Sequence, residues 1–174
     1  MRTFHTGGVA GGGDITLGLP RVEEIFELRT PNNTAIISDV DGEVLEIKQS
    51  EREKIVKILA ESGDDGKSKK KNESKEYIVP FGKNLLVKEG DKVRAGDAIS
   101  SGSADIKYLF GIAGIERVQN YIINEVSKIY SLQGASINRK HIEVIVRQMF
   151  ARLRIKEVGD SYFGEGEIVE RAEF

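Results

Sequence analysis

Arg2 and His5 are the residues of this sequence whose types and spacing best suit chemistry. Residues three positions apart can share one face of a helix, so the guanidinium and the imidazole could act on the same group. A basic side chain and a histidine on a mobile segment suit a cap over phosphates. By composition alone, however, a single histidine near the start of a chain reads as an ordinary solvated residue.

The segment that follows this pair is rich in glycine, at positions 7, 8, 11, 12 and 13. Each of these glycines costs a helix roughly 1 kcal/mol relative to alanine, so any helix formed here is marginal. Residues 1–13 are therefore predicted to form a mobile loop.

A short helix is predicted from Pro20 to Leu28, because Val22 and Ile25 recur at helical spacing and proline is well placed in a first turn. The helix should stop before Pro31, since a residue that precedes proline disfavours the helical region. Residues 1–29 are assigned to a first segment of the chain on this basis.

The composition excludes several classes of protein. The chain has 174 residues, of which 39% are hydrophobic, and this is enough to bury a core. The net charge of −2 gives no global argument for a nucleic-acid partner, and the absence of cysteine excludes disulfides and thiolate metal sites. No apolar run approaches the roughly 20 residues of a membrane span, so a cytoplasmic protein is expected.

Residues 30–104 are predicted to form a β-rich module. Short β-branched runs at 35–37, 44–47, 55–59, 77–79 and 85–87 are separated by turn residues and read as antiparallel strands. The polar stretch 62–75 has no apolar anchor and is predicted to be a disordered hairpin tip. Two Gly-Asp pairs, at 90–91 and 96–97, predict similar turns in a tightly wound barrel.

Residues 105–174 are predicted to be mainly helical. One apolar stripe runs through Ile115, Val118, Ile122, Val126 and Ile129, and Gly134 suits the position that closes such a helix. Asn138 suits the N-cap of a second helix, with an apolar line formed by Ile142, Ile145, Met149 and Leu153. Both apolar faces are broader than a two-helix hairpin hides. The fold class is α+β: a small antiparallel barrel-sandwich hybrid-like module, a long helical hairpin and a flexible N-terminal loop.

Three further features have ordinary explanations that are preferred to functional ones. The Gly-Asp pattern also resembles biotinyl and lipoyl carrier domains, but the methionines, Met1 and Met149, do not flank a lysine at a hairpin tip. The lysine run 69–71 reads as a solvated loop tip, because acidic residues flank it. The charges around His141 (Arg139, Lys140, Arg147, Arg152 and Arg154) read as surface charge rather than as a DNA contact.

Three separated segments resemble one known family, the largest catalytic subunit (β′) of bacterial DNA-directed RNA polymerase. MRTFHTGG and DITLGLPRVEEIFE resemble its trigger loop, and RVQNYIINEV, YSLQG and KHIEVIVRQM resemble a later core segment. The segments occur in the family's order, and together the resemblance covers most of the chain. This is far more specific than a single glycine motif.

The resemblance implies roles for particular residues. Met1 would lie against the base of an incoming nucleoside triphosphate, and Arg2 and His5 would contact its triphosphate. Arginine offers a permanently charged fork of donors, and histidine can donate a hydrogen bond or a proton near neutral pH. Gly18 would be a hinge on the return limb, beside Pro20. Closure of this loop would assist nucleotidyl transfer, and whether His5 acts as a general acid or by position stays open.

The resemblance also implies a setting for the chain. Residues 30–104 would be the jaw near downstream duplex DNA, and 105–174 the following core segment. Partners would be the rest of β′, the β, α and ω subunits and a sigma factor, in the cytoplasm at the nucleoid, with no membrane. This chain would bind no cofactor, because the Mg²⁺ of the full enzyme would be held elsewhere, and it would be inactive alone. A stand-alone interaction module that binds transcription regulators is the first alternative, and a carrier domain is the second.

Overall fold

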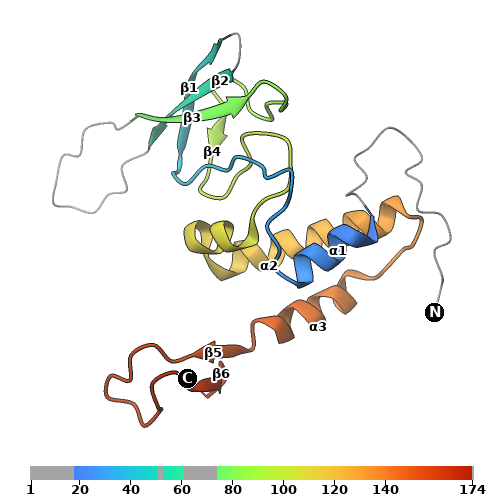
Figure 1. Ribbon diagram of the computed structural model, residues 1–174, viewed down its shortest axis with the longest axis vertical. Coiled ribbons are helices and arrows are strands. Elements are labelled where there is room, and N and C mark those ends of the chain that lie inside the picture. Colours follow the sequence, from blue (N-terminus) through green and yellow to red (C-terminus); the bar gives the residue numbers. More distant parts are fainter. Residues whose placement is uncertain (1–17, 51–52, 61–73, 174) are drawn as a thin grey trace. The chain divides into compact units, whose positions relative to one another are not determined.

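The computed structural model describes residues 18–50, 53–60 and 74–173, and it divides into two compact units (Figure 1). The sheet unit comprises residues 24–118. The helical unit comprises, among the described residues, 18–23 and 119–173. The unit boundaries fall within helix α1 (Leu19–Phe26) and helix α2 (Ile106–Leu132). Strands dominate one unit and helices the other, which confirms the predicted α+β class.

The sheet unit is built on a curled antiparallel sheet of four strands in the order β3-β2-β1-β4 (Figure 1). The strands are β1 (Gly42–Gln49), β2 (Glu53–Ala60), β3 (Ser74–Pro80) and β4 (Lys92–Val93). Alternate residues point to one face and form the core. The buried cluster contains Val44, Val56, Ile58, Tyr77, Val79, Val93 and Ile99. A bulge between Val44 and Glu46 shifts the register of β1 against β2, which increases the local twist.

Two of the predicted strands, 35–37 and 85–87, do not form. In the first, Ile37 makes an isolated bridge to Ala98, and in the second, Leu85 makes one to Ser100. The backbone hydrogen bonds of this region join short stretches that are distant in sequence. For example, the N–H of Leu86 donates to the carbonyl of Ile99. The periodicity of the sequence does not distinguish an isolated bridge of this kind from a regular strand.

The predicted disordered tip, 62–75, lies mostly outside the described residues, but its last two residues need correction. Ser74 and Lys75 begin β3, where they pair with Leu59 and Ile58 of β2. Lys75 is held there by an ion pair with the carboxylate of Asp39. This long-range partner offsets the ordering cost that the polar local sequence suggested.

The two Gly-Asp pairs form matching turns, as predicted. The carboxylate of Asp91 accepts a hydrogen bond from the N–H of Lys88 at 2.7 Å, and Asp97 accepts one from Arg94 at 2.9 Å. Each aspartate thus closes a turn over the three preceding residues. Asp97 also forms an ion pair with Arg117 in α2, which fixes the second turn to the helix within the sheet unit.

Helix α2 begins at an aspartate cap and contains a kink. The carboxylate of Asp105 accepts a hydrogen bond from the N–H of Lys107 at 2.9 Å. Gly114 has φ 75° and ψ −175°, which interrupts the helix and was not predicted. The predicted apolar stripe is otherwise confirmed, since its members from Val118 to Ile129 are buried. Gly134 has φ 71° and closes the helix as predicted.

The second predicted helix is α3 (Arg139–Met149), and its predicted cap is confirmed: the side chain of Asn138 accepts a hydrogen bond from the N–H of Lys140. The predicted line of apolar residues is partly wrong. Leu153 lies in strand β5 (Arg152–Arg154), which pairs with β6 (Ile168–Glu170). Of the line, Ile142 is buried, whereas Ile145 is 51% exposed. An apolar face of α3 therefore remains uncovered within the part of the chain described.

Candidate functional site

The predicted site residues Met1, Arg2 and His5 lie outside the described residues, so their roles stay predictions. Gly18 and Pro20, the predicted hinge, are described: Gly18 lies just before α1 and Pro20 in its first turn. The carbonyl of Gly18 accepts a hydrogen bond from the N–H of Arg21 at 2.9 Å. A β-carbon at Gly18 would lie 3.2 Å from Nε2 of Gln133, so glycine leaves room for this side-chain amide. The described site is thus the place where the N-terminal segment joins the helical unit.

Arg21 is the central residue of this junction. Its side chain is only 3% exposed. Its Nη2 donates a long hydrogen bond of 3.4 Å to the hydroxyl of Tyr121, and its Nε lies 4.0 Å from Oε1 of Glu125. Tyr121 and Glu125 are one helical turn apart on α2, so both lie on the face that meets α1. The junction therefore combines a buried cation, an acceptor and a carboxylate.

The sequence does not identify Arg21 as a site residue, because an arginine between a proline and a valine is typical of surface charge. The signal available in the sequence is spacing: Arg21 directly precedes Val22 and lies four residues before Ile25, and both of these are buried. Its partners are about a hundred residues distant in sequence. Local pattern therefore could not identify them.

Helix α3 is fixed to α2 by a second polar cluster in the helical unit. The guanidinium of Arg139 bonds to Glu143 at 2.7 Å, to Asn124 at 3.2 Å and to Asn120 at 3.4 Å. His141 is exposed in the first turn of the same helix. Because the bonds of Arg139 run within the protein, this arginine has a structural role in holding the two helices together.

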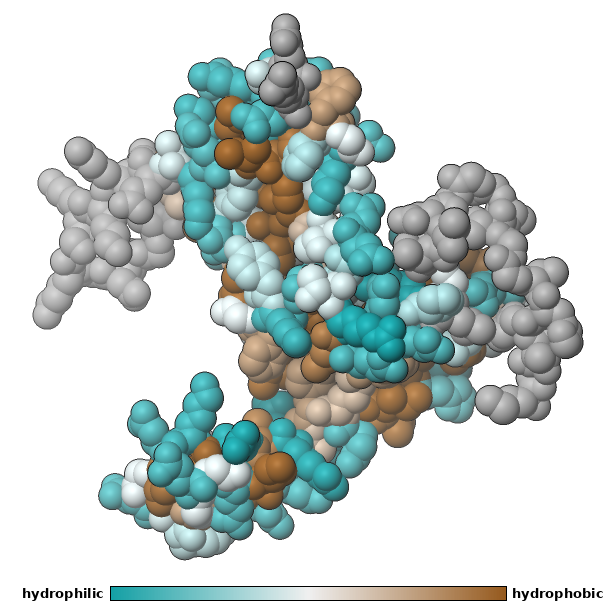
Figure 2. Space-filling model, in the orientation of Figure 1, coloured by the Kyte–Doolittle hydropathy of each residue, from teal (hydrophilic) through white to brown (hydrophobic). Residues whose placement is uncertain are grey.

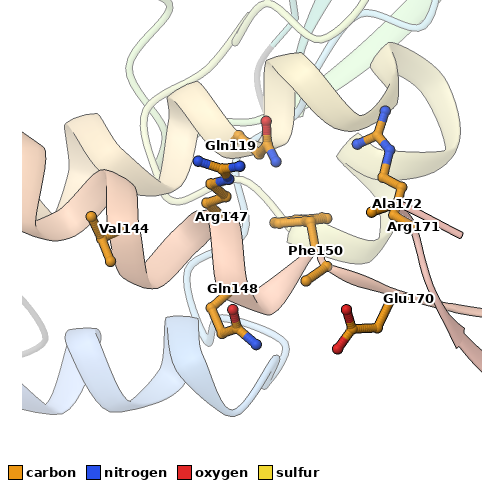
Figure 3. Close-up of a pocket in the computed structure, with 9 residues that line it drawn as sticks. Gln119, Val144, Arg147, Gln148, Phe150, Glu170, Arg171 and Ala172 are labelled. Atoms are coloured by element: carbon orange, nitrogen blue, oxygen red, sulfur yellow. The ribbon is translucent and has the colours of Figure 1, made fainter.

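A groove of about 620 Å³ lies in the helical unit between α2, the end of α3 and the residues after β6 (Figure 3). Phe150 projects into its centre, with Arg147 and Gln119 on one side and Glu170 and Arg171 on the other (Figure 3). An aromatic ring between charged groups suits contact with another protein segment better than catalysis.

The arginines that closely follow His141 in the sequence are divided between two elements. Arg147 lies on α3, whereas Arg152 and Arg154 lie on β5, and all three are exposed. They do not form one line on a helix face. The lysine run 69–71 lies outside the described residues.

Exposed apolar side chains also occur in the sheet unit. Leu45, at the bulge of β1, is 51% exposed, and Ile78, in the edge strand β3, is 57% exposed. Figure 2 shows apolar surface in this part of the molecule between hydrophilic side chains. The sheet unit thus offers an apolar surface as well as a core.

Within residues 18–50, 53–60 and 74–173, no group of three or more His, Cys, Asp or Glu side chains is placed to hold a metal ion. None of the helices described there is long and apolar enough to span a membrane.

The described residues form a curled antiparallel sheet and a set of helices, which defines a protein of the α+β class. Comparison with known proteins gives its family. The family model described as RNA polymerase Rpb1, domain 5, matches residues 1–169, and the chain belongs to this family. The resemblance found from the sequence motifs is thereby confirmed.

Individual relatives support the same assignment. The chain is 44% identical over 174 residues to the DNA-directed RNA polymerase subunit beta′ of Acetivibrio thermocellus, and 45% identical over 174 residues to that of Clostridium acetobutylicum. The beta′ subunit of Desulforudis audaxviator is 45% identical over 170 residues, which is 98% of this chain. The chain spans about 14% of the length of each of these relatives.

Proposed function

We propose that this chain acts as part of the β′ subunit of a bacterial DNA-directed RNA polymerase and supplies its trigger loop, its jaw and a following helical segment. The observation that carries the proposal is identity of 44–45% along the whole chain to beta′ subunits, including the segment that contains Arg2 and His5. Residues 1–29 would be the trigger-loop segment, 30–104 the jaw and 105–174 the core segment.

The proposed mechanism is closure of a lid over a nucleoside triphosphate. Met1 contacts the base, while Arg2 and His5 bind the triphosphate and stabilise charge on the leaving pyrophosphate. Phosphoryl transfer depends mostly on positioning and charge stabilisation, so such contacts suffice to accelerate it. Because the glycines at 7, 8 and 11–13 weaken any helix here, closure requires the substrate contacts and thereby favours the correct nucleotide.

Other parts of the enzyme complete this function. Mg²⁺ is held by residues outside this chain, and the chain alone is inactive. Its partners are the remainder of β′, the β, α and ω subunits and a sigma factor. Downstream duplex DNA lies near the jaw, and the assembly works in the cytoplasm at the nucleoid.

The test is single-nucleotide addition by the assembled polymerase. His5→Ala should slow addition by roughly 10²-fold, the lower range for loss of a positioned acid or base, and Arg2→Ala should slow it comparably. His141→Ala and Arg152→Ala are matched controls, because both side chains are exposed and both residues lie outside the segment 1–29. Wild-type rates for both Arg2→Ala and His5→Ala would reject the proposal.

A stand-alone interaction module is the second candidate, and the groove around Phe150 together with exposed Leu45 and Ile78 favours it. In that case Arg2 and His5 have no functional role, and the substitution Ile78→Asp weakens the binding of a transcription regulator. The two candidates differ in one measurement, since only the polymerase role predicts slow addition after His5→Ala.

A further inference from the structure

The walls of the groove around Phe150 come from α2, from α3 and from the end of β6, all in the helical unit. Backbone hydrogen bonds join the last two walls: Arg171 donates its N–H to the carbonyl of Ala151 at 2.7 Å, and Leu153 of β5 pairs with Val169 of β6. The groove of about 620 Å³ is therefore built by the fold itself, and a partner can dock without rearranging it.

The groove presents two guanidinium groups without an internal partner. Arg147 and Arg171 are exposed, and within the described part of the chain neither side chain forms an ion pair or a hydrogen bond. Arg139, on the same helix as Arg147, is by contrast bonded to three side chains. The lining holds these two arginines and one glutamate, Glu170, so its charge is positive on balance. Carboxylates are the groups that such free guanidiniums bind best.

Apolar surface lies beside these charges. Phe150 projects into the centre of the groove, and Val144, which also lines it, is 69% exposed (Figure 3). Ile145 and Met149 of the same helix are 51% and 36% exposed. Aromatic and arginine side chains are the usual anchors of protein interfaces, and exposed apolar surface beside them marks a contact site.

We propose that this groove binds a segment of the remaining β′ polypeptide in which an apolar side chain is flanked by carboxylates. The apolar side chain packs against Phe150 and Val144. The carboxylates pair with Arg147 and Arg171, which lie on opposite sides of the phenyl ring. This inference rests on the proposed function, because it requires that the chain acts within β′.

The small size of the groove favours a segment of the same subunit over a separate protein. Nine residues line the groove, whereas a stable interface between separate proteins uses about 20–30 residues on each side. A tethered segment needs fewer contacts, because its effective concentration is of the order of millimolar. The chain spans about 14% of the length of its relatives, so a β′ subunit supplies much further polypeptide that is tethered in this way.

The test is site-specific photo-crosslinking in the purified, assembled polymerase. The substitution Val144→p-benzoylphenylalanine places a photoreactive group at an exposed position of the groove, and mass spectrometry identifies the crosslinked peptide. The expected product contains one β′ peptide from outside this chain, with Asp or Glu close to the crosslinked residue. Tyr162→p-benzoylphenylalanine is the matched control, because Tyr162 is 88% exposed but does not line the groove, and it should not capture this peptide.

Three results would overturn the proposal. One is the absence of a β′ crosslink from Val144→p-benzoylphenylalanine in a polymerase that assembles normally. The second is a crosslink to a β′ segment that contains no carboxylate. The third is a crosslink to another subunit, a sigma factor or a transcription regulator in place of β′, and a regulator would favour the interaction module.

Charge reversal tests the two arginines. The double variant Arg147→Glu with Arg171→Glu should lower the yield of the β′ crosslink about tenfold or more, because carboxylates would then face carboxylates. Substitution of lysine for the identified Asp or Glu should restore the yield. Lys140→Glu is the matched control, because Lys140 is an exposed cation of α3 that does not line the groove, and it should leave the yield unchanged. An undiminished yield in the double variant would overturn the proposal.

Crosslinking and nucleotide addition separate this inference from the proposed function. Wild-type addition rates for Arg2→Ala and His5→Ala beside the expected crosslink would reject the trigger-loop role and support the groove assignment. Slow addition by Arg2→Ala and His5→Ala without the crosslink would overturn the groove assignment alone. Failure of the chain to enter a polymerase assembly would overturn both.

Discussion

The phenol of Tyr77, in β3, donates a hydrogen bond to the carboxylate of Asp39. The backbone N–H of Asp39 donates in return to the hydroxyl of Tyr77 at 3.3 Å. The same carboxylate forms an ion pair with Lys75. Asp39 lies in the segment before β1, and β3 is an edge strand of the sheet. The cluster therefore ties this segment to the β3 edge and helps to close the curled sheet.

This cluster predicts a pH dependence of stability. Partial burial acts to raise the pKa of Asp39, but the hydrogen bonds from Lys75 and Tyr77 outweigh burial and hold that pKa below its ordinary value of 3.8. A group whose folded pKa is lowered stabilises the fold above its unfolded pKa, and the contribution is lost as the pH falls through the folded pKa. The stabilisation by Asp39 should therefore be complete above about pH 5, and it should be lost progressively as the pH falls below 3.8 and through the lower folded pKa.

The measurement is the urea midpoint for unfolding of the sheet unit, followed by circular dichroism between neutral and acidic pH. Asp39→Asn should unfold at lower urea than the wild type at neutral pH, and the two midpoints should converge in acid. Asp160→Asn, at an exposed position of the helical unit, is the control. An equal deficit of Asp39→Asn at every pH would show that carboxylate charge is not the cause.

The end of α1 predicts a stabilising substitution. Leu28 has φ 54°, and the bond from Arg29 N to the carbonyl of Glu24 at 3.0 Å closes the helix. Such a conformation costs a residue with a β-carbon about 1 kcal/mol, and Leu28 is 41% exposed, so little burial offsets the cost. Leu28→Gly should therefore raise the free energy of unfolding by up to about 1 kcal/mol.

Gly134 occupies the equivalent position after α2 and gives the reverse experiment. Ala135 N bonds to the carbonyl of Tyr130 at 3.0 Å, as Arg29 does at α1. Gly134→Ala should lower the free energy of unfolding by about 1 kcal/mol. If both substitutions destabilise the protein in denaturant titrations, the leucine side chain contributes more packing than its exposure indicates.

The kink in α2 predicts a larger cost. Gly114 adopts a φ/ψ combination essentially restricted to glycine, and a β-carbon there would meet no other atom within 4 Å. Gly114→Ala should thus cost about 1–3 kcal/mol through backbone strain alone. Gly111→Ala is the matched control, because Gly111 lies in the helical part of α2 with open space around it and should gain about 1 kcal/mol. A neutral Gly114→Ala, measured by thermal unfolding, would mean that the kink straightens without penalty.

The features that could be predicted from the sequence are those that local chemistry decides. Asn138 caps α3 and Gly134 closes α2, because each acts on backbone groups within a few residues. The helical period gave the buried stripe from Val118 to Ile129 for the same reason. Such features depend on the nearest turn of the chain and little else.

The features that could not be predicted depend on distant partners. Leu153 continues the helical spacing of α3, yet it pairs with Val169 in a strand, because β6 supplies the hydrogen bonds. Lys75 belongs to a polar run that reads as disordered, and Asp39 holds it in β3. Arg21 is the same case at the candidate site, since its burial and its distant partners Tyr121 and Glu125 distinguish it from surface charge.

The proposed role of His5 on the triphosphate predicts different effects for two substitutions in the assembled polymerase. Glutamine keeps a hydrogen-bond donor at a similar reach but cannot transfer a proton near neutral pH. Because phosphoryl transfer depends mainly on positioning and charge stabilisation, His5→Gln should recover most of the rate lost in His5→Ala. Single-nucleotide addition at saturating substrate measures both variants, with His141→Gln as the control. Equal losses in His5→Gln and His5→Ala would instead assign the imidazole to proton transfer, since the donor alone would then contribute nothing.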